Sequence, residues 1–263
     1  MRYLNSRNRA ILREMVSTDF KVRYQGSVLG YTWSLLKPLF LFAILYLVFT
    51  YIIPLGKEVE HYPVYLLIGI VLWNFFTEAT MIGASSIVAR GDLIRKISIP
   101  RYLLVIASSL SAIINLGLSL LAVVVFALFN GVIPTWNWLL IIPIIIELYV
   151  FALGVSFILA TAYVKFRDIT YIWEIFLQAG FYASAIIYPL TLVPEKLHQW
   201  FFMNPIVQII QDARHAIATD TSVTLWSTVQ SWMVVVPFII IAVVALVGWF
   251  YFKKQSQYFA EDI

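Results

Sequence analysis

The chain has no cysteine among its 263 residues, and only 12% of its residues are charged. The absence of cysteine excludes disulfide bonds, thiolate metal ligands and cysteine nucleophiles. A soluble domain contains about a quarter charged residues, so this composition does not suit a surface that faces water on every side. Hydrophobic residues make up 62% of the chain instead, and the mean hydropathy is +0.87.

Motifs for catalysis are missing as well. No G-x-x-x-x-G-K-[ST] segment occurs, so the chain is expected not to bind or hydrolyse ATP itself. No G-x-S-x-G nucleophile motif occurs, and the three histidines, His61, His198 and His215, lack the spacing of metal ligands. The sequence therefore predicts no catalytic residue, no metal site and no cofactor in this chain.

Long apolar runs are the main feature that the sequence does contain. Leu39–Ile53, Leu103–Phe129 and Leu139–Tyr163 have no polar face. A hydrocarbon core of ~30 Å takes about 20 helical residues to cross, and its backbone groups must be paired within the segment. The runs do not alternate as the strands of a barrel would. The sequence predicts an all-α, polytopic membrane protein.

Six transmembrane helices are expected, within a membrane domain of residues 28–252 and before a short tail, 253–263. The first run lies too far from the N-terminus and is too long for a cleavable signal peptide, so none is expected. The expected spans are Val28–Ile53, Tyr65–Val88, Leu103–Phe129, Leu139–Tyr163, Tyr171–Tyr188 and Met233–Phe252.

The basic residues predict the orientation. Of the 18 Lys and Arg residues, most lie before the first expected span, between the second and third, between the fourth and fifth, or after the last. The positive-inside rule therefore places both termini in the cytoplasm. Because the charge follows the sides of a membrane, the net charge of +4 does not suggest a nucleic-acid partner.

Residues 189–220 contain a further apolar stretch that we do not expect to cross. A seventh span would place Asp212, Arg214 and His215 in lipid, where each charge costs a few kcal/mol, and would move the C-terminal lysines to the other side. A pair of re-entrant or interfacial helices between the fifth and sixth spans avoids both costs. Irregular backbone enters a membrane only where protein covers it or where it lines a cavity.

The first 27 residues predict an amphipathic helix in the membrane surface. At 100° per residue, Leu4, Ile11, Met15 and Val22 form an apolar stripe, and the basic side lies opposite. A plain basic flank of the first span would explain the charge but not the periodicity. The residues expected to meet anionic headgroups are Arg9, Arg13, Lys21 and Arg23.

The loop 89–102 predicts one short helix. Gly91 permits a turn, Asp92 can cap a helix, and Pro100 ends it. Such a helix suits the groove of a soluble partner, although a solvated loop would show the same pattern. Within the spans, Glu78 and Glu147 are carboxylates that either couple an ion, pair helices or line a hydrophilic path. Trp73, Phe75, Phe76 and Trp200 either belong to an interfacial belt or line that path.

Four segments resemble the type-2 ABC exporter permeases, and within them those that export polysaccharides such as O-antigen, capsule or teichoic acid. The first is residues 19–38, DFKVRYQGSVLGYTWSLLKP. The others are residues 93–101, LIRKISIPR; residues 165–169, KFRDI; and Asn204-Pro205 followed by Arg214. Together they span most of the chain, in the order and topology of that family.

The resemblance implies a dimer of permeases in the bacterial cytoplasmic membrane, each docked on an ATP-binding cassette subunit that binds ATP and Mg. It implies a polysaccharide substrate linked to a polyprenyl (pyro)phosphate. The residues implied for docking are Asp92, Leu93, Ile94, Arg95, Lys96, Pro100, Arg101, Arg167 and Asp168. The candidates for the conduit are Trp73, Phe75, Phe76, Glu78, Glu147, Trp200, Asn204 and Arg214.

Two other functions fit the sequence. One is a permease of the same superfamily that exports a drug or a small lipid. The other, from a different class, is an ion-coupled secondary carrier that uses Glu78 and Glu147. No set of acid, base and nucleophile supports a membrane enzyme.

Overall fold

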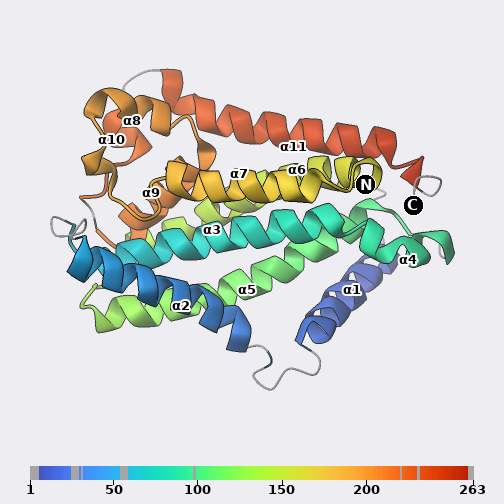
Figure 1. Ribbon diagram of the computed structural model, residues 1–263, viewed down its shortest axis with the longest axis horizontal. Helices are drawn as coiled ribbons and strands as arrows, with labels where there is room; N and C mark the ends of the chain where they lie inside the picture. Colours follow the sequence, from blue (N-terminus) through green and yellow to red (C-terminus); the bar gives the residue numbers. More distant parts are fainter. Residues whose placement is uncertain are drawn as a thin grey trace.

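The computed structural model describes residues 6–24, 30, 32–53, 59–96, 99–219, 221–229 and 232–259, and all regular elements in these ranges are helices (Figure 1). The long helices run side by side along one axis of the molecule. The prediction of an all-α protein is confirmed for this part of the chain.

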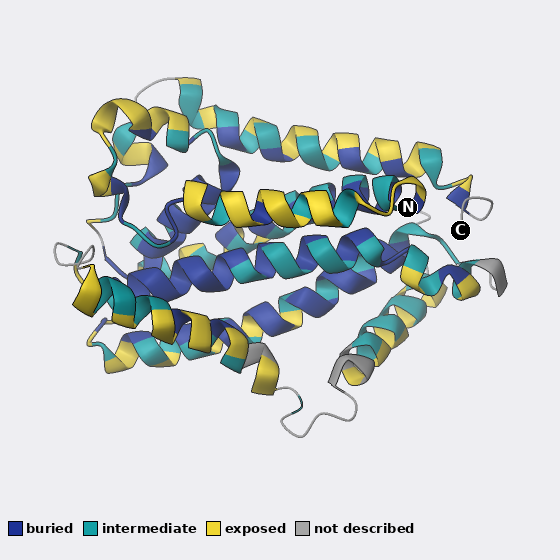
Figure 2. Ribbon diagram, in the orientation of Figure 1, coloured by how far each residue is buried: buried dark blue, intermediate teal, exposed yellow. Residues whose placement is uncertain are grey.

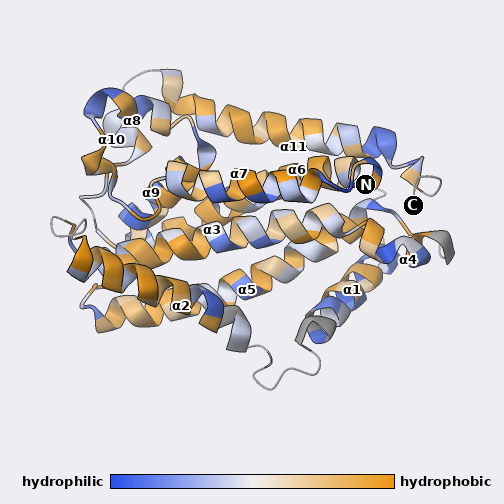
Figure 3. Cartoon of the chain, in the orientation of Figure 1, coloured by the Kyte–Doolittle hydropathy of each residue, from blue (hydrophilic) through white to orange (hydrophobic). Residues whose placement is uncertain are grey.

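Four helical segments are long and apolar enough to cross a membrane, which makes the chain a multi-pass membrane protein. They contain α3 (Tyr62–Ser85), α5 (Tyr102–Phe129), α6 (Ile141–Lys165, preceded by the 3-10 turn Trp136–Leu140) and α11 (Val236–Gln255, preceded by Trp232–Val235). The exposed sides of α5, α6 and α11 carry apolar residues, as lipid contact requires (Figure 3). The second, third, fourth and sixth expected spans are confirmed as helices of sufficient length.

The first and fifth expected spans are shorter in the structure. Helix α2 covers Thr32–Leu47 and continues as a π-helical turn, Val48–Ile52. Helix α7 covers Ile169–Ala183, 15 residues, and so ends five residues before the expected Tyr188. The chain leaves the helix there because Ala185 adopts a left-handed conformation with φ of 50°.

Small residues bring α6 close to both of its main neighbours. A Cβ on Gly154 would lie 2.7 Å from Ala245 Cα of α11, and one on Gly248 would overlap the carbonyl oxygen of Gly154. On the other side, Ser156 Oγ donates a hydrogen bond of 3.1 Å to the carbonyl of Ala79 in α3. Close backbone approach of this kind holds helices together where lipid removes the hydrophobic driving force.

Short helices gather at one end of the bundle, between α7 and α11. They are α8 (Glu195–Phe201), α9 (Pro205–Ile217) and α10 (Leu225–Thr228), with the 3-10 turn Leu190–Leu192. Helix α9 is buried along almost its whole length and contacts α3, α6 and α11. Two helices were expected in residues 189–220, and α8 and α9 lie there. Protein covers α9 on nearly all sides.

The opposite end carries α1 (Ser6–Tyr24), the 3-10 turn Val88–Arg90 and α4 (Gly91–Lys96). A cluster of apolar side chains, which includes Met15 of α1, Ile94 of α4 and Phe252 of α11, joins these elements to the bundle. The basic segments that predicted the orientation lie at this end.

We predict that Gly248→Ala lowers the free energy of unfolding by about 1–3 kcal/mol, because the new methyl group meets backbone that cannot move aside cheaply. Gly117→Ala is the matched control, since nothing lies within 4 Å of a Cβ there, and it should be neutral or stabilising by about 0.5–1 kcal/mol. Heating the detergent-solubilised variants and measuring the fraction that stays monodisperse checks both. Equal stability of the two variants would contradict the close packing of α6 and α11.

Candidate functional site

Helix α3 is buried on every side except one, and that side is polar. Between Val64 and Thr80, only Asn74, Thr77 and Glu78 are not buried (Figure 2). Spacings of three and four residues place these side chains on one face of the helix. A face turned to lipid would carry Leu, Ile or Phe, whereas polar and ionisable residues inside a membrane mark water-filled paths or binding sites. We call Asn74, Thr77 and Glu78 the polar stripe.

Two pockets flank the polar stripe and share Asn74, Thr77 and Met81. One, of about 470 Å³, lies between α2, α3 and α5. The other, of about 440 Å³, lies between α2, α3 and α7. Because they share a floor, we treat them together as the α3 groove. Helix α2 and helix α7 form its walls, and α7 has only Leu177 buried.

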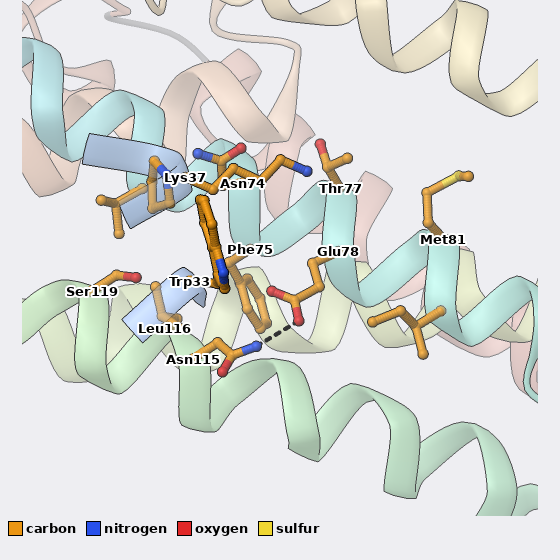
Figure 4. A pocket seen from close by; sticks show the side chains of 13 residues that line it. Trp33, Lys37, Asn74, Phe75, Thr77, Glu78, Met81, Asn115, Leu116 and Ser119 are labelled. Carbon is orange, nitrogen blue, oxygen red and sulfur yellow. Dashed lines mark hydrogen bonds between the residues drawn. The ribbon is translucent and has the colours of Figure 1, made fainter. Parts of the chain in front are cut away.

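The first pocket combines charged, amide and aromatic side chains (Figure 4). Asn115 of α5 donates a hydrogen bond of 2.7 Å from Nδ2 to Oε1 of Glu78, across the pocket floor. Lys37 and Trp33 enter from α2, and Phe75 lies beside the Trp33 ring. Among the described residues, the pocket therefore holds one cation, one anion and two aromatic rings within reach of the same space.

The residues predicted for a conduit do not all lie together. Trp73, Phe75 and Glu78 line the α3 groove. Phe76 instead stacks on Phe151 of α6 at 5.4 Å, inside the bundle. Trp200 is 57% exposed on α8, at the end far from α4 (Figure 1).

Two further predicted conduit residues take part in contacts of α9. Asn204 caps α9 by accepting a hydrogen bond from the amide of Ile206 at 3.0 Å. Gln208 of α9 donates to Glu147 at 3.4 Å and to Asp212 at 2.8 Å, so one amide nitrogen joins two carboxylates. Glu147 and Glu78 therefore lie in different settings, one against α9 and one in the α3 groove.

Arg214, also predicted for the conduit, is fully buried and fastens three segments together. Its Nε donates to the carbonyl of Tyr65 in α3 at 3.0 Å, and its two terminal nitrogens donate to the carbonyls of Ala185 and Ile186 at 2.9 and 2.6 Å. The guanidinium carbon lies 3.6 Å from the centre of the Tyr65 ring. Carbonyl dipoles and an aromatic face together compensate the loss of water around the charge.

The room for this guanidinium depends on a glycine. A Cβ at position 69 would lie 2.6 Å from Nη2 of Arg214. The sequence does not show this contact, because an Arg 145 positions away from a Gly leaves no local pattern. We call Arg214, its three carbonyl partners and Gly69 the arginine clamp.

The residues implied for docking lie at the end that carries α4. Asp92, Arg167 and Asp168 are exposed, and the Arg167 guanidinium stacks over the Tyr163 ring at 5.2 Å. Leu93 and Ile94 pack against the apolar cluster of that end, while Pro100 and Arg101 are half-buried. The side chains of Arg95, Lys96 and Arg23 lie outside the described part.

Helix α1 covers part of the segment predicted to be amphipathic, and Leu4 and the side chain of Val22 lie outside the described residues. Arg9, Arg13 and Lys21 are exposed, and Met15 packs against the bundle. The sequence did not predict the ion pair between Asp19 and Arg90, which joins α1 to the turn before α4. The sequence analysis also did not select Lys37, Asn74 and Asn115. Asn74 and Asn115 could have been found, because an amide side chain within an apolar helix is a usable signal of a polar site.

Comparison with known proteins bears on the whole of this architecture. Residues 12–217 match the family described as ABC-2 type transporter. The chain is 29% identical to the O-antigen export system permease protein RfbA of Myxococcus xanthus, over 77% of this chain and 78% of that protein. The identity to RfbA of Klebsiella pneumoniae is 29% over 80% and 81% of the two chains. It is 22% to the polysialic acid transport protein KpsM of Escherichia coli, over 76% and 78%.

The polar stripe predicts that water reaches Thr77. Because the chain has no cysteine, single cysteine variants need no prior replacements. Thr77→Cys should react with a water-soluble, membrane-impermeant thiol reagent, since the thiolate forms only in a hydrated setting. Val243→Cys, 50% exposed on the apolar face of α11, is the lipid-facing control and should react at least about tenfold more slowly. Equal rates at the two positions would rule out a hydrated groove.

The arginine clamp predicts two destabilising substitutions with different chemistry. Arg214→Lys keeps the charge but cannot reach carbonyls in both partner segments, and should cost about 3 kcal/mol or more. Gly69→Ala keeps all three donors and should cost about 1–3 kcal/mol through the overlap with Nη2. Thermal denaturation in detergent measures both. Wild-type stability of Gly69→Ala would show that the guanidinium does not sit against α3 as described.

Proposed function

Since the chain belongs to the ABC-2 type transporter family of membrane proteins, we propose that it is the permease subunit of an ATP-driven polysaccharide exporter. Family membership confirms the resemblance carried by residues 19–38 and 93–101. The relatives support the choice of substrate, because their names describe O-antigen export and polysialic acid transport. A drug or small lipid as substrate and coupling to an ion gradient have no comparable support.

The observation that carries this proposal within the molecule is the polar stripe of α3. A polysaccharide is hydrophilic, so its path through a membrane needs polar side chains in place of lipid contact. Asn74, Thr77 and Glu78 supply them between two walls, α2 and α7. We propose that the α3 groove is half of the path, and that a second copy of the chain supplies the other half in a homodimer.

The orientation follows from charge. The end with α1, α4, Lys165 and Lys253 is proposed to face the cytoplasm of a bacterial inner membrane, with both termini on that side. Helices α2 and α7 then complete six crossings, and α8 and α9 form the re-entrant pair at the outer end. The basic side of α1 lies where anionic lipid and the polyprenyl (pyro)phosphate of a lipid-linked substrate gather, with about 1 kcal/mol of attraction per basic residue.

The partner is proposed to be an ATP-binding cassette subunit that binds ATP and Mg and docks on α4 and the loop 165–168. That loop is exposed throughout, and it presents Phe166, Arg167 and Asp168 together. An exposed aromatic ring between charged residues is the composition of an interaction surface rather than of a lipid contact. Helix α4 lies at the same end and is fixed to the bundle through Leu93 and Ile94.

We predict that Arg167→Glu lowers polysaccharide export at least about tenfold when the variant is co-expressed with its ATPase. Reversing a charge at an interface costs several kcal/mol, and about 1.4 kcal/mol already equals a factor of ten. Lys196→Glu is the matched control, because it makes the same reversal at an exposed position of α8 at the outer end. Export is measured as surface polysaccharide in a strain that lacks its own permease.

The outcomes separate two parts of the proposal. Wild-type export by Arg167→Glu would exclude the loop 165–168 from the docking surface and leave the transport function intact. Failure of the unaltered chain to export polysaccharide with its cognate ATPase would refute the function itself. Membrane levels of both variants, measured by immunoblot, show that a loss of export is not a loss of protein.

A further inference from the structure

The first pocket of the α3 groove lies halfway along the bundle. Asn74 is the thirteenth of the 24 residues of α3, and Asn115 is the fourteenth of the 28 residues of α5. Both amides therefore sit at the middle of long apolar helices, where a polar group without a partner costs free energy. A pocket of about 470 Å³ falls in the range of sites that hold small molecules.

The lining charges exclude simple occupants. A phosphate or other anion would gain from Lys37 but would be repelled by the Glu78 carboxylate in the same pocket, and a cation would meet the opposite conflict. A lipid acyl chain would leave Lys37 and Asn74 desolvated and would offer them no hydrogen bond. An occupant without net charge that both donates and accepts hydrogen bonds avoids these conflicts.

The remaining lining selects a ring with apolar faces. Trp33 and Phe75 present aromatic surface beside the polar groups, as Figure 4 shows. An amide side chain both donates and accepts, a carboxylate accepts and an ammonium donates. A pyranose has hydroxyl groups of both kinds around its edge and C–H groups on its faces, which suit aromatic rings.

We infer that the pocket of Trp33, Lys37, Asn74, Glu78 and Asn115 is a binding subsite for one uncharged pyranose unit. This inference rests on the proposed function, since it names what the α3 groove holds as a sugar chain passes. The Trp33 ring supports one face of the sugar, and Glu78, oriented by Asn115, accepts from a hydroxyl group. Such a subsite would bind the sugar chain weakly between transport steps, through hydrogen bonds and ring contacts rather than through ion pairs.

The test uses the complete complex of permease and ATPase in lipid nanodiscs, with methyl glycosides of glucose, galactose, mannose and N-acetylglucosamine as probes. Saturation-transfer NMR should show binding of at least one of them, with the strongest transfer to ring C–H protons. Trp33→Ala and Glu78→Gln should each weaken that binding about tenfold or more. Trp33 is 47% exposed, so its removal leaves the core of the bundle intact.

The controls are Trp232→Ala and Glu195→Gln, which make matching changes at exposed positions of the outer end. They should bind the probe as the unaltered complex does. If an exporting complex binds no probe, or binds it equally well in Trp33→Ala and Glu78→Gln, the subsite is refuted while the function stands. If the unaltered complex exports no polysaccharide, the proposed function fails instead.

Discussion

A guanidinium without a carboxylate partner holds together the end of this molecule that carries α8 and α9. Among the described residues no acidic side chain forms an ion pair with Arg214, and its charge is met by the carbonyls of residues 65, 185 and 186 and by the Tyr65 ring. A buried carboxylate partner would add a second desolvation cost. The backbone carbonyl groups after the end of a helix, in contrast, need hydrogen-bond donors whether or not an arginine is present. The arginine clamp therefore has two effects. It supplies hydrogen-bond donors to the carbonyl groups of Ala185 and Ile186, which follow the end of α7, and it attaches α9 to α3.

That attachment explains why α3 can carry polar residues. A single apolar helix with Asn74, Thr77 and Glu78 would place them in lipid, where each is costly. In the bundle, α5 and α6 pack along α3 over most of its length, and the clamp fixes its outer part. Between Val64 and Thr80 only the polar stripe remains uncovered, and it faces the α3 groove, which α2, α5 and α7 border. Burial of the other residues of α3 offsets the free-energy cost of placing these polar side chains within the bundle.

The sequence predicts the parts of this fold that depend on local pattern. Continuous apolar runs predict the positions of α3, α5, α6 and α11. Gly91 and Pro100 predict the limits of α4, and the distribution of Lys and Arg predicts that the basic segments lie at one end. The sequence does not predict features that depend on contacts between residues far apart in the chain. Gly69 and Arg214, or Asp19 and Arg90, acquire meaning only once folding brings them together. For the same reason the sequence left open whether Phe76 belongs to a belt or to a conduit, since an aromatic ring in an apolar helix has no signature that separates the two. In the structure Phe76 is buried and packs on Phe151.

Helix α3 packs against α2, α5, α6, α7 and α9 and leads along the chain to α4, and this limits how the parts can be coupled. Its inner end leads through Ser86 and Ile87 to the turn Val88–Arg90 and α4, where Asp19 of α1 pairs with Arg90. Its middle forms the floor of the groove, and its outer end is held by the clamp. Because α6 packs against α3 through Gly83 and Ser156 without spare room, α3 cannot shift alone. A force applied at α4 must therefore bend the short link at residues 86–87 or move α3 and α6 together. Of the two walls, α7 would break the fewer close contacts if it moved away from α3. Two of these contacts are the packing of Trp73 against Gly180 and the hydrogen bond of 3.0 Å that Trp173 donates to Thr80. Widening of the groove is thus expected on the α7 side, against a floor that stays whole.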